Sequence, residues 1–229
     1  MAFISTITGN FKGFILFTLI IIIHELGHIT AAIYYKWNIE KVILLPFGAL
    51  TLFNEKVNKP LKEEFIILIM GPIFQIVGTY FMPNAFDYSM TILTFNLLPI
   101  IPLDGSKFVN IFLNKITNFK TSNILTIYIS VLTVIIILIK VKFDLLFMLI
   151  ITFIFLKIFE EYKNKNNLFN LFLLERYTYN LNFKKRKIIK GENLNKMKKD
   201  YNHIFYKNGK YITEKHTLEK RFDFKNKMW

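Results

Sequence analysis

The chain has 229 residues, and 53% of them are hydrophobic, with 25 Phe alone. Such a composition is too apolar for an ordinary soluble domain of this length. The formal net charge of +14 is concentrated near the end: residues 157–229 hold 19 Lys and Arg against 8 Asp and Glu, whereas residues 1–156 hold 11 against 8. An apolar body with a basic tail is typical of a membrane protein whose tail lies in the cytoplasm against anionic lipid. Because the basic excess lies beside apolar segments, we expect no nucleic-acid partner.

The sequence contains no cysteine. This excludes disulfides, thiolate nucleophiles and Cys-type zinc sites, so any metal ion must be held by His and carboxylate side chains. No small-residue cleavage site follows the first apolar run, and we therefore expect no cleavable signal peptide.

Apolar stretches long enough to cross a bilayer, or nearly so, recur along the first 160 residues. Residues 1–10 are apolar but too short to span, and we expect them to be the remnant of a further span. The sequence therefore predicts an all-α polytopic membrane protein with five to six transmembrane helices. The five apolar stretches are 14–33, 65–82, 90–103, 124–139 and 143–159.

A shorter apolar segment lies between the first two predicted spans. Residues 42–53, VILLPFGALTLF, are rich in β-branched residues around a Pro-Gly turn signal. This pattern predicts a short re-entrant β-hairpin.

The charges of the connecting segments indicate the orientation. Residues 36–63 hold five Lys and residues 104–120 hold three, whereas residues 83–89 hold none. Since positive charge favours the cytoplasmic side, we expect 36–63, 104–120 and the tail to be cytoplasmic.

The tail is predicted in two parts that follow a transmembrane domain over 1–160. Residues 161–182 contain the apolar run LFNLFLL flanked by charge, which predicts an interfacial amphipathic helix. Residues 183–229 are basic and polar, with a hairpin signal, KNGK, at 207–210. We expect a small basic cytoplasmic tail there.

The chemistry is concentrated in HELGH, residues 24–28. On a helix His24 and His28 are four residues apart and share one face, so both imidazoles can reach one metal ion, and Glu25 can take a proton from its water. A surface helix with these residues is the ordinary alternative. It fails here because an unpartnered charge within an apolar span costs about 2.5–3.5 kcal/mol.

A catalytic zinc ion usually has three protein ligands and one open position. The other two His residues lie in the basic tail, and the best third ligand is Asp104, in NLLPIIPLDG at 96–105. The prolines of this run predict a broken helix, which would let the carboxylate turn inward.

Together these residues resemble the site-2 protease family of intramembrane zinc metalloproteases, whose hallmarks are HExxH and a later NxxPxxPLDG. The chain is most similar to the sporulation stage IV protein FB branch, through LLPFG, KPLKEEF, GP, FEEY and FLLERY in that order between residues 44 and 177. Relatives have a span before the HELGH helix, often have Gly where Ser106 stands, and end in a CBS domain, of which this tail would be a truncated remnant.

The resemblance implies zinc held by His24, His28 and Asp104, with Glu25 as general base and with Asn96 and Pro102 beside the substrate groove. It implies that the substrate is a membrane-associated protein, namely a sigma-factor precursor. It also implies inhibitory membrane partner proteins. Two alternatives stay open. One is a catalytically silent pseudoprotease, and the other is a zinc transporter, which would need polar ligands at several depths of the membrane.

Overall fold

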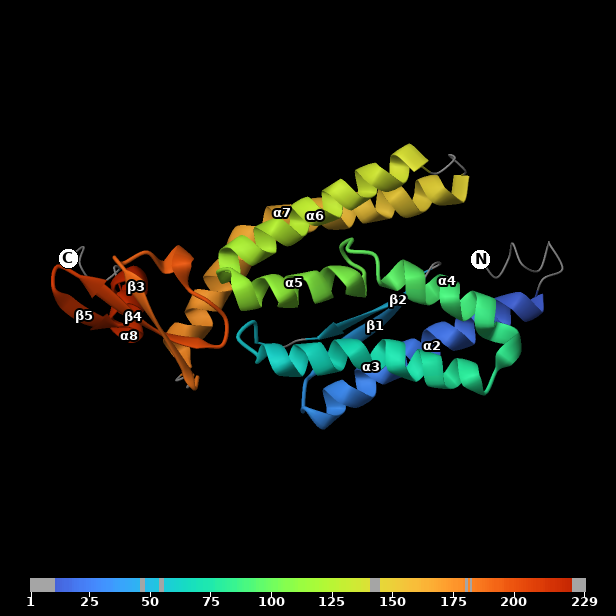
Figure 1. Ribbon diagram of the computed structural model, residues 1–229, viewed down its shortest axis with the longest axis horizontal. Helices are drawn as coiled ribbons and strands as arrows, with labels where there is room; N and C mark the ends of the chain where they lie inside the picture. Colours follow the sequence, from blue (N-terminus) through green and yellow to red (C-terminus); the bar gives the residue numbers. More distant parts are fainter. Residues whose placement is uncertain are drawn as a thin grey trace.

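The computed structural model describes residues 11–45, 48–53, 56–140, 145–179, 181 and 183–223. It is mostly helical. The long elements of the body are α2 (Phe11–Tyr34), α3 (Leu61–Tyr80), α4 (Phe86–Asn96), α5 (Asp104–Ile116), α6 (Phe119–Lys140) and α7 (Leu145–Thr178), with a single 3-10 turn, η1 (Pro83–Ala85), before α4. A β-hairpin lies beside α2 and α3, and a small unit of strands and a helix lies at the C-terminal end (Figure 1).

Two of these helices, α2 and α6, are long and apolar enough to cross a membrane by length and composition, among the described residues. They coincide with the predicted spans at 14–33 and 124–139. The count of five to six spans is not confirmed. The predicted remnant span at 1–10 lies outside the described residues.

The third predicted span, 90–103, is interrupted, as its prolines predict, and is not one continuous helix. α4 ends at Asn96, and its 11 residues rise only about 16 Å, well short of a bilayer core of about 30 Å. Residues 97–103 form turns, and α5 then begins at Asp104, so 104–116 is a helix rather than a loop. The prolines at 99 and 102 remove backbone donors and explain the break.

α2 and α3 pack closely because glycines stand where they cross. A Cβ added at Gly27 would lie 2.2 Å from the Met70 carbonyl oxygen, and one added at Gly71 would lie 2.3 Å from the His28 ring. Only glycine permits backbones to approach in this way. The helix that carries HELGH is therefore held directly against α3.

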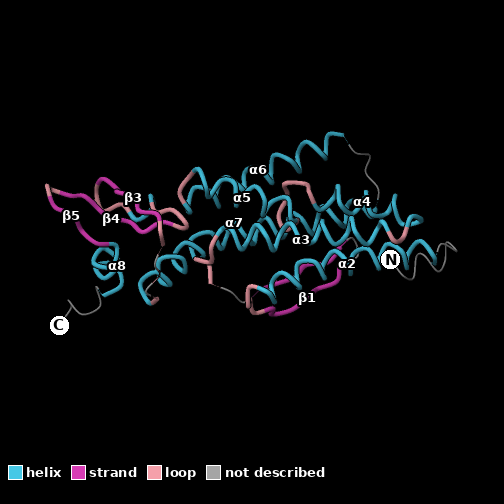
Figure 2. Tube along the Cα trace, turned by 60° about the horizontal axis from the view of Figure 1, so that its bottom comes forward, coloured by secondary structure: helices cyan, strands magenta, loops and turns pink. Residues whose placement is uncertain are grey.

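The predicted hairpin is present. β1 (Ile39–Leu45) pairs antiparallel with β2 (Gly48–Phe53), with Val42 opposite Thr51, while its turn at 46–47 lies outside the described residues. Figure 2 shows the hairpin lying along α2. The strand that faces α2 is β2, which contacts it directly.

The C-terminal part contains strands and a helix in addition to the end of α7. Residues 161–178 are the second half of α7 rather than a separate helix, and their place at the membrane surface stays a prediction. Beyond them, β3 (Lys185–Lys190) pairs parallel with β4 (Tyr201–Lys207), and a 3-10 turn, η2 (Leu194–Lys196), lies between the two strands. β4 pairs antiparallel with β5 (Lys210–Thr213), and α8 (Glu214–Phe222) follows.

The KNGK turn is confirmed: Asn208 and Gly209 both have positive φ, as a two-residue hairpin loop of type I′ requires. We call residues 183–223 the C-terminal unit. Its core is continuous with the helical body, because Met197, Phe205 and Leu218 pack with Phe172 of α7 and Phe119 of α6.

We predict that Gly27→Ala lowers the free energy of unfolding by about 1–3 kcal/mol, because the new methyl group meets backbone that cannot move aside. Gly78→Ala is the matched control on α3, since its Cβ meets only the Ile23 side chain. Thermal unfolding in detergent compares the two. Equal stability of both variants would contradict close backbone packing at Gly27.

Candidate active site

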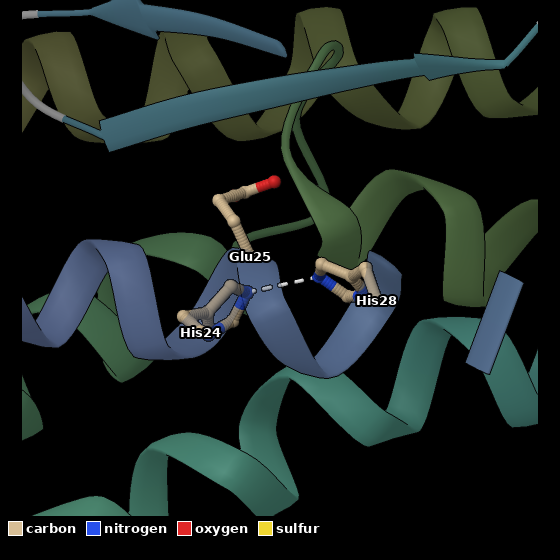
Figure 3. Close-up of side chains that lie close together, drawn as sticks. All are labelled: His24, Glu25 and His28. Atoms are coloured by element: carbon tan, nitrogen blue, oxygen red, sulfur yellow. Dashed lines mark hydrogen bonds between the residues drawn. The ribbon is translucent and has the colours of Figure 1, made fainter. Parts of the chain in front are cut away.

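α2 buries His24, Glu25 and His28 in the interior of the helical body. Figure 3 shows the two imidazoles lying beside each other along α2. One ligand atom from each of the three residues lies within 4.8 Å of the others. A helix places residues four apart on one face, and the two imidazoles meet as the HELGH spacing predicts.

Asp104 joins this group from 80 residues away in the sequence. Its Oδ2 lies 3.0 Å from Nε2 of His24 and 3.0 Å from Nε2 of His28, and the two Nε2 atoms are 3.1 Å apart. The neighbouring Gly105 makes this possible, since a Cβ there would lie 2.2 Å from the Leu97 carbonyl oxygen. The broken helix folds back on itself, and this turns the first residue of α5 inward.

The partners of the other ring nitrogens determine the histidine tautomers. The Gln75 amide donates to the Ser89 carbonyl (2.7 Å), so its oxygen faces His24 and accepts from Nδ1 at 2.7 Å. Nδ1 of His28 donates to the Ile67 carbonyl at 2.8 Å. With Nδ1 protonated in both rings, both Nε2 lone pairs point toward Asp104.

The three converging atoms suit a zinc ion. Two imidazole lone pairs and a carboxylate oxygen repel one another unless a cation lies among them. Donors around a tetrahedral zinc with bonds of about 2.0–2.1 Å are separated by about 3.3 Å, close to the observed 3.0–3.1 Å. The residues present therefore fit the metal.

Glu25 lies outside this triangle. Its Oε2 accepts a hydrogen bond of 2.5 Å from the Thr51 hydroxyl of β2. Figure 3 shows the carboxylate turned toward the strand above it and away from the two rings. The hairpin thus holds one oxygen of the carboxylate and fixes its orientation.

Lys107 contacts the site on its other side. Its ammonium donates to Oδ1 of Asp104 at 3.0 Å, while Oδ2 faces the histidines. One carboxylate oxygen of Asp104 therefore contacts the ammonium, and the other contacts the imidazoles. Lys107 and Asp104 lie within one turn of α5.

A cavity of about 760 Å³ opens beside these residues. Asn96 and Pro102, predicted to flank the substrate groove, both line it, and the Asn96 amide lies 3.5 Å from Nε2 of His24. The lining of the cavity also includes polar residues of α5, α6 and α7, namely Asn110, Asn123, Thr126, Lys157 and Glu160.

Sequence reasoning missed three contributors: Gln75, Thr51 and Lys107. Gln75 is fully buried and is the only amide in the apolar run 65–82, so its isolation was a usable signal. Thr51 and Lys107 gave no such signal, because a strand threonine and a loop lysine are ordinary.

We predict that Gln75→Leu weakens metal retention by about 10–100-fold, because His24 loses the acceptor that fixes its tautomer. Thr79→Val is the control: Thr79 bonds the same Ser89 but does not touch His24. Metal content after dialysis against a graded chelator measures the effect. Unchanged retention in Gln75→Leu would remove Gln75 from the support of His24.

Known proteins are similar in sequence to this chain over a region that includes HELGH. The sequence profile of peptidase family M50 matches residues 12–86. Stage IV sporulation protein FB of Bacillus subtilis is 32% identical over 195 residues, covering 77% of this chain and 68% of that protein. A zinc metalloprotease of Methanocaldococcus jannaschii is 29% identical over 116 residues, covering 44% of this chain and 34% of that protein.

Among solved structures, the site-2 protease from Methanocaldococcus jannaschii aligns with 65% of this chain and 76% of its own, with 28% identity and a TM-score of 0.49. The similarity to the Bacillus protein, 32% identity across 68% of that relative, establishes the relationship. The chain belongs to peptidase family M50, the site-2 protease family of zinc metalloproteases.

Proposed function

We propose that this protein is an intramembrane protease that hydrolyses a peptide bond of a membrane-associated protein, and that the substrate is a sigma-factor precursor. The observation that carries the proposal is the convergence of His24, His28 and Asp104 beside Glu25, at the edge of a large cavity. The similarity to a sporulation protein supports the choice of substrate. Inhibitory membrane proteins would regulate it, as in the sporulation branch of the family.

The proposed topology has five to six spans with the C-terminal unit in the cytoplasm. It is supported by the arrangement of the ends: the connection before α3, the connection between α5 and α6, and the C-terminal unit lie at one end of the bundle (Figure 1). Lys56 and Lys59 precede α3, Lys115 and Lys120 flank the connection between α5 and α6, and the C-terminal unit is basic, so anionic lipid would lie beside this end.

In the proposed mechanism His24, His28 and Asp104 would hold the zinc ion. When bound, zinc supplies an acidified water and polarises the scissile carbonyl. Glu25 takes the proton of the attacking water and passes it to the leaving amine nitrogen. Thr51 orients the Glu25 carboxylate, and Lys107 keeps Oδ2 of Asp104 directed at the histidines.

The hairpin has a proposed role in presenting the substrate. A helical substrate has every backbone hydrogen bond satisfied, so it must unwind before it is cut. Ile43 lines the cavity and is exposed, as is Val42 beside it. An extended substrate could pair with an edge of this hairpin, and backbone hydrogen bonds would then hold the unwound segment near Glu25.

Glu25→Gln should lower the cleavage rate by about 100-fold or more, because the amide cannot accept the water proton. Metal content should be nearly unchanged, since Glu25 is outside the triangle of donors. The measurement is co-expression with a candidate sigma-factor precursor, followed by immunoblotting and metal analysis of the purified enzyme. Cleavage near the wild-type rate would exclude Glu25 as the base, and zinc movement without cleavage would favour a transporter.

Asp104→Asn should lower both metal retention and activity, because a neutral amide is a poorer zinc ligand than a carboxylate. Asp87→Asn is the control, since it removes one carboxylate at the exposed start of α4, outside the site. Metal content and cleavage are measured for both variants. Full metal occupancy with full activity in Asp104→Asn would remove Asp104 from the site.

A further inference from the structure

Four residues of the C-terminal unit, Met197–Asp200, lie against the ends of three helices of the body. Helix ends leave backbone donors and acceptors without partners inside the helix. At the start of α6, the Phe119 amide donates to the Met197 carbonyl at 3.0 Å. At the end of α5, the Lys198 ammonium donates to the Ile116 carbonyl at 2.5 Å. The segment thus caps both helices from outside their own sequence.

The third helix end is the start of α3. Its N-cap residue is Pro60, which provides no side-chain cap. Instead the Leu61 amide donates to the Asp200 carboxylate, with N–O distances of 3.1 and 3.4 Å. Lys199, itself buried, forms an ion pair with Glu64 in the same turn. A carboxylate at a helix N-terminus also interacts favourably with the helix dipole.

The capping segment is held in place by Arg176 of α7. The guanidinium donates to the Lys198 carbonyl at 3.0 Å, to the Tyr201 carbonyl at 2.9 Å and to Glu214 of α8 at 2.9 Å. Its Nε donates to the side chain of Asn58, just before α3, at 2.8 Å. One buried cation therefore joins the segment to the body and to the last helix.

Two further groups hold the same region. Glu175 accepts from the backbone amides of Val57 and Asn58 at 2.8 and 2.9 Å. His203 accepts from the Lys198 amide through Nε2 at 2.9 Å. Burial lowers the pKa of His203, which keeps the ring neutral and Nε2 available as an acceptor.

The helices that are capped in this way carry the active site. α3 supplies Gln75 behind His24 and the Ile67 carbonyl behind His28, and α5 begins with Asp104. We infer that Met197–Asp200 is a positioning element of the active site, which sets the spacing of α3 and α5 and so the approach of Asp104 to the two histidines. This inference rests on the proposed function, and it makes the C-terminal unit part of the catalytic body.

The alternative is that the C-terminal unit only holds the substrate and does not position the active site. In that case the unit would change KM for a long substrate and would leave the metal site unaltered. A positioning element would change kcat and metal retention for any substrate, because a misplacement of about 1 Å can cost about 100-fold in rate. The two roles therefore differ in what is measured.

The test uses the full chain with Lys199→Met and Asp200→Gly combined. Asp200 has a φ of 60°, which glycine adopts freely, so the variant removes the Asp200 cap of α3 and the Lys199–Glu64 ion pair without straining the backbone. Asp200→Asn alone is the conservative variant, because asparagine also tolerates this φ and keeps an acceptor for the Leu61 amide. Lys207→Met is the matched control, since Lys207 pairs with Glu192 inside the C-terminal unit.

Zinc release is measured against excess chelator, and kcat and KM are measured with a fluorescent peptide that carries one apolar segment of about 20 residues. We expect the double variant to release zinc about 10-fold faster or more and to lose kcat at unchanged KM, with both other variants close to wild type. Unchanged zinc release in the double variant, or an equal effect of Lys207→Met, would overturn the inference. A wild-type protein that binds zinc but cuts nothing would refute the proposed function, while zinc release would still test the capping segment.

Discussion

The structure depends on three lone-pair atoms that share one small volume: Nε2 of His24, Nε2 of His28 and Oδ2 of Asp104, at separations of 3.0–3.1 Å. In a buried site such acceptors are costly unless a cation neutralises them, since an unsatisfied buried polar group alone costs about 1–3 kcal/mol. The contacts to Gln75 and to the Ile67 carbonyl commit both rings to present these lone pairs. The arrangement is useful only with a metal ion, and it must be held rigidly to keep its geometry.

That rigidity comes from close contact between the backbones of neighbouring helices. Gly27 and Gly71 let α2 lie against α3, and Gly105 lets α5 fold against the carbonyls that end α4. These contacts lie at the proposed metal site: His28 packs on Gly71, and Asp104 adjoins Gly105. The helices are in turn joined through polar contacts, such as the Gln75–Ser89 hydrogen bonds between α3 and α4. The close packing of the helices and the proposed metal site therefore depend on neighbouring residues.

A large cavity lies beside His28 and Asp104. It is lined by polar residues of α5, α6 and α7 together with apolar ones such as Ile111 and Phe153. Residues 197–200 contact the start of α3, the end of α5 and the start of α6. The basic C-terminal unit thus combines a folded core with charge on its surface.

The sequence by itself determined the chemistry and much of the local structure. HELGH on an apolar helix indicates a metal site, because unpartnered polar groups in an apolar span are costly, and the KNGK turn and the hairpin at 42–53 follow from local backbone preferences. Asp104 was predicted as the third ligand from its position after a proline-broken helix. The tertiary structure alone decided the rest: the new helix, α5, that begins at Asp104, the choice of Gln75 and Thr51 as partners, and the capping of α3 by Asp200, 139 residues away. These depend on contacts between distant segments, which no local pattern of residues encodes.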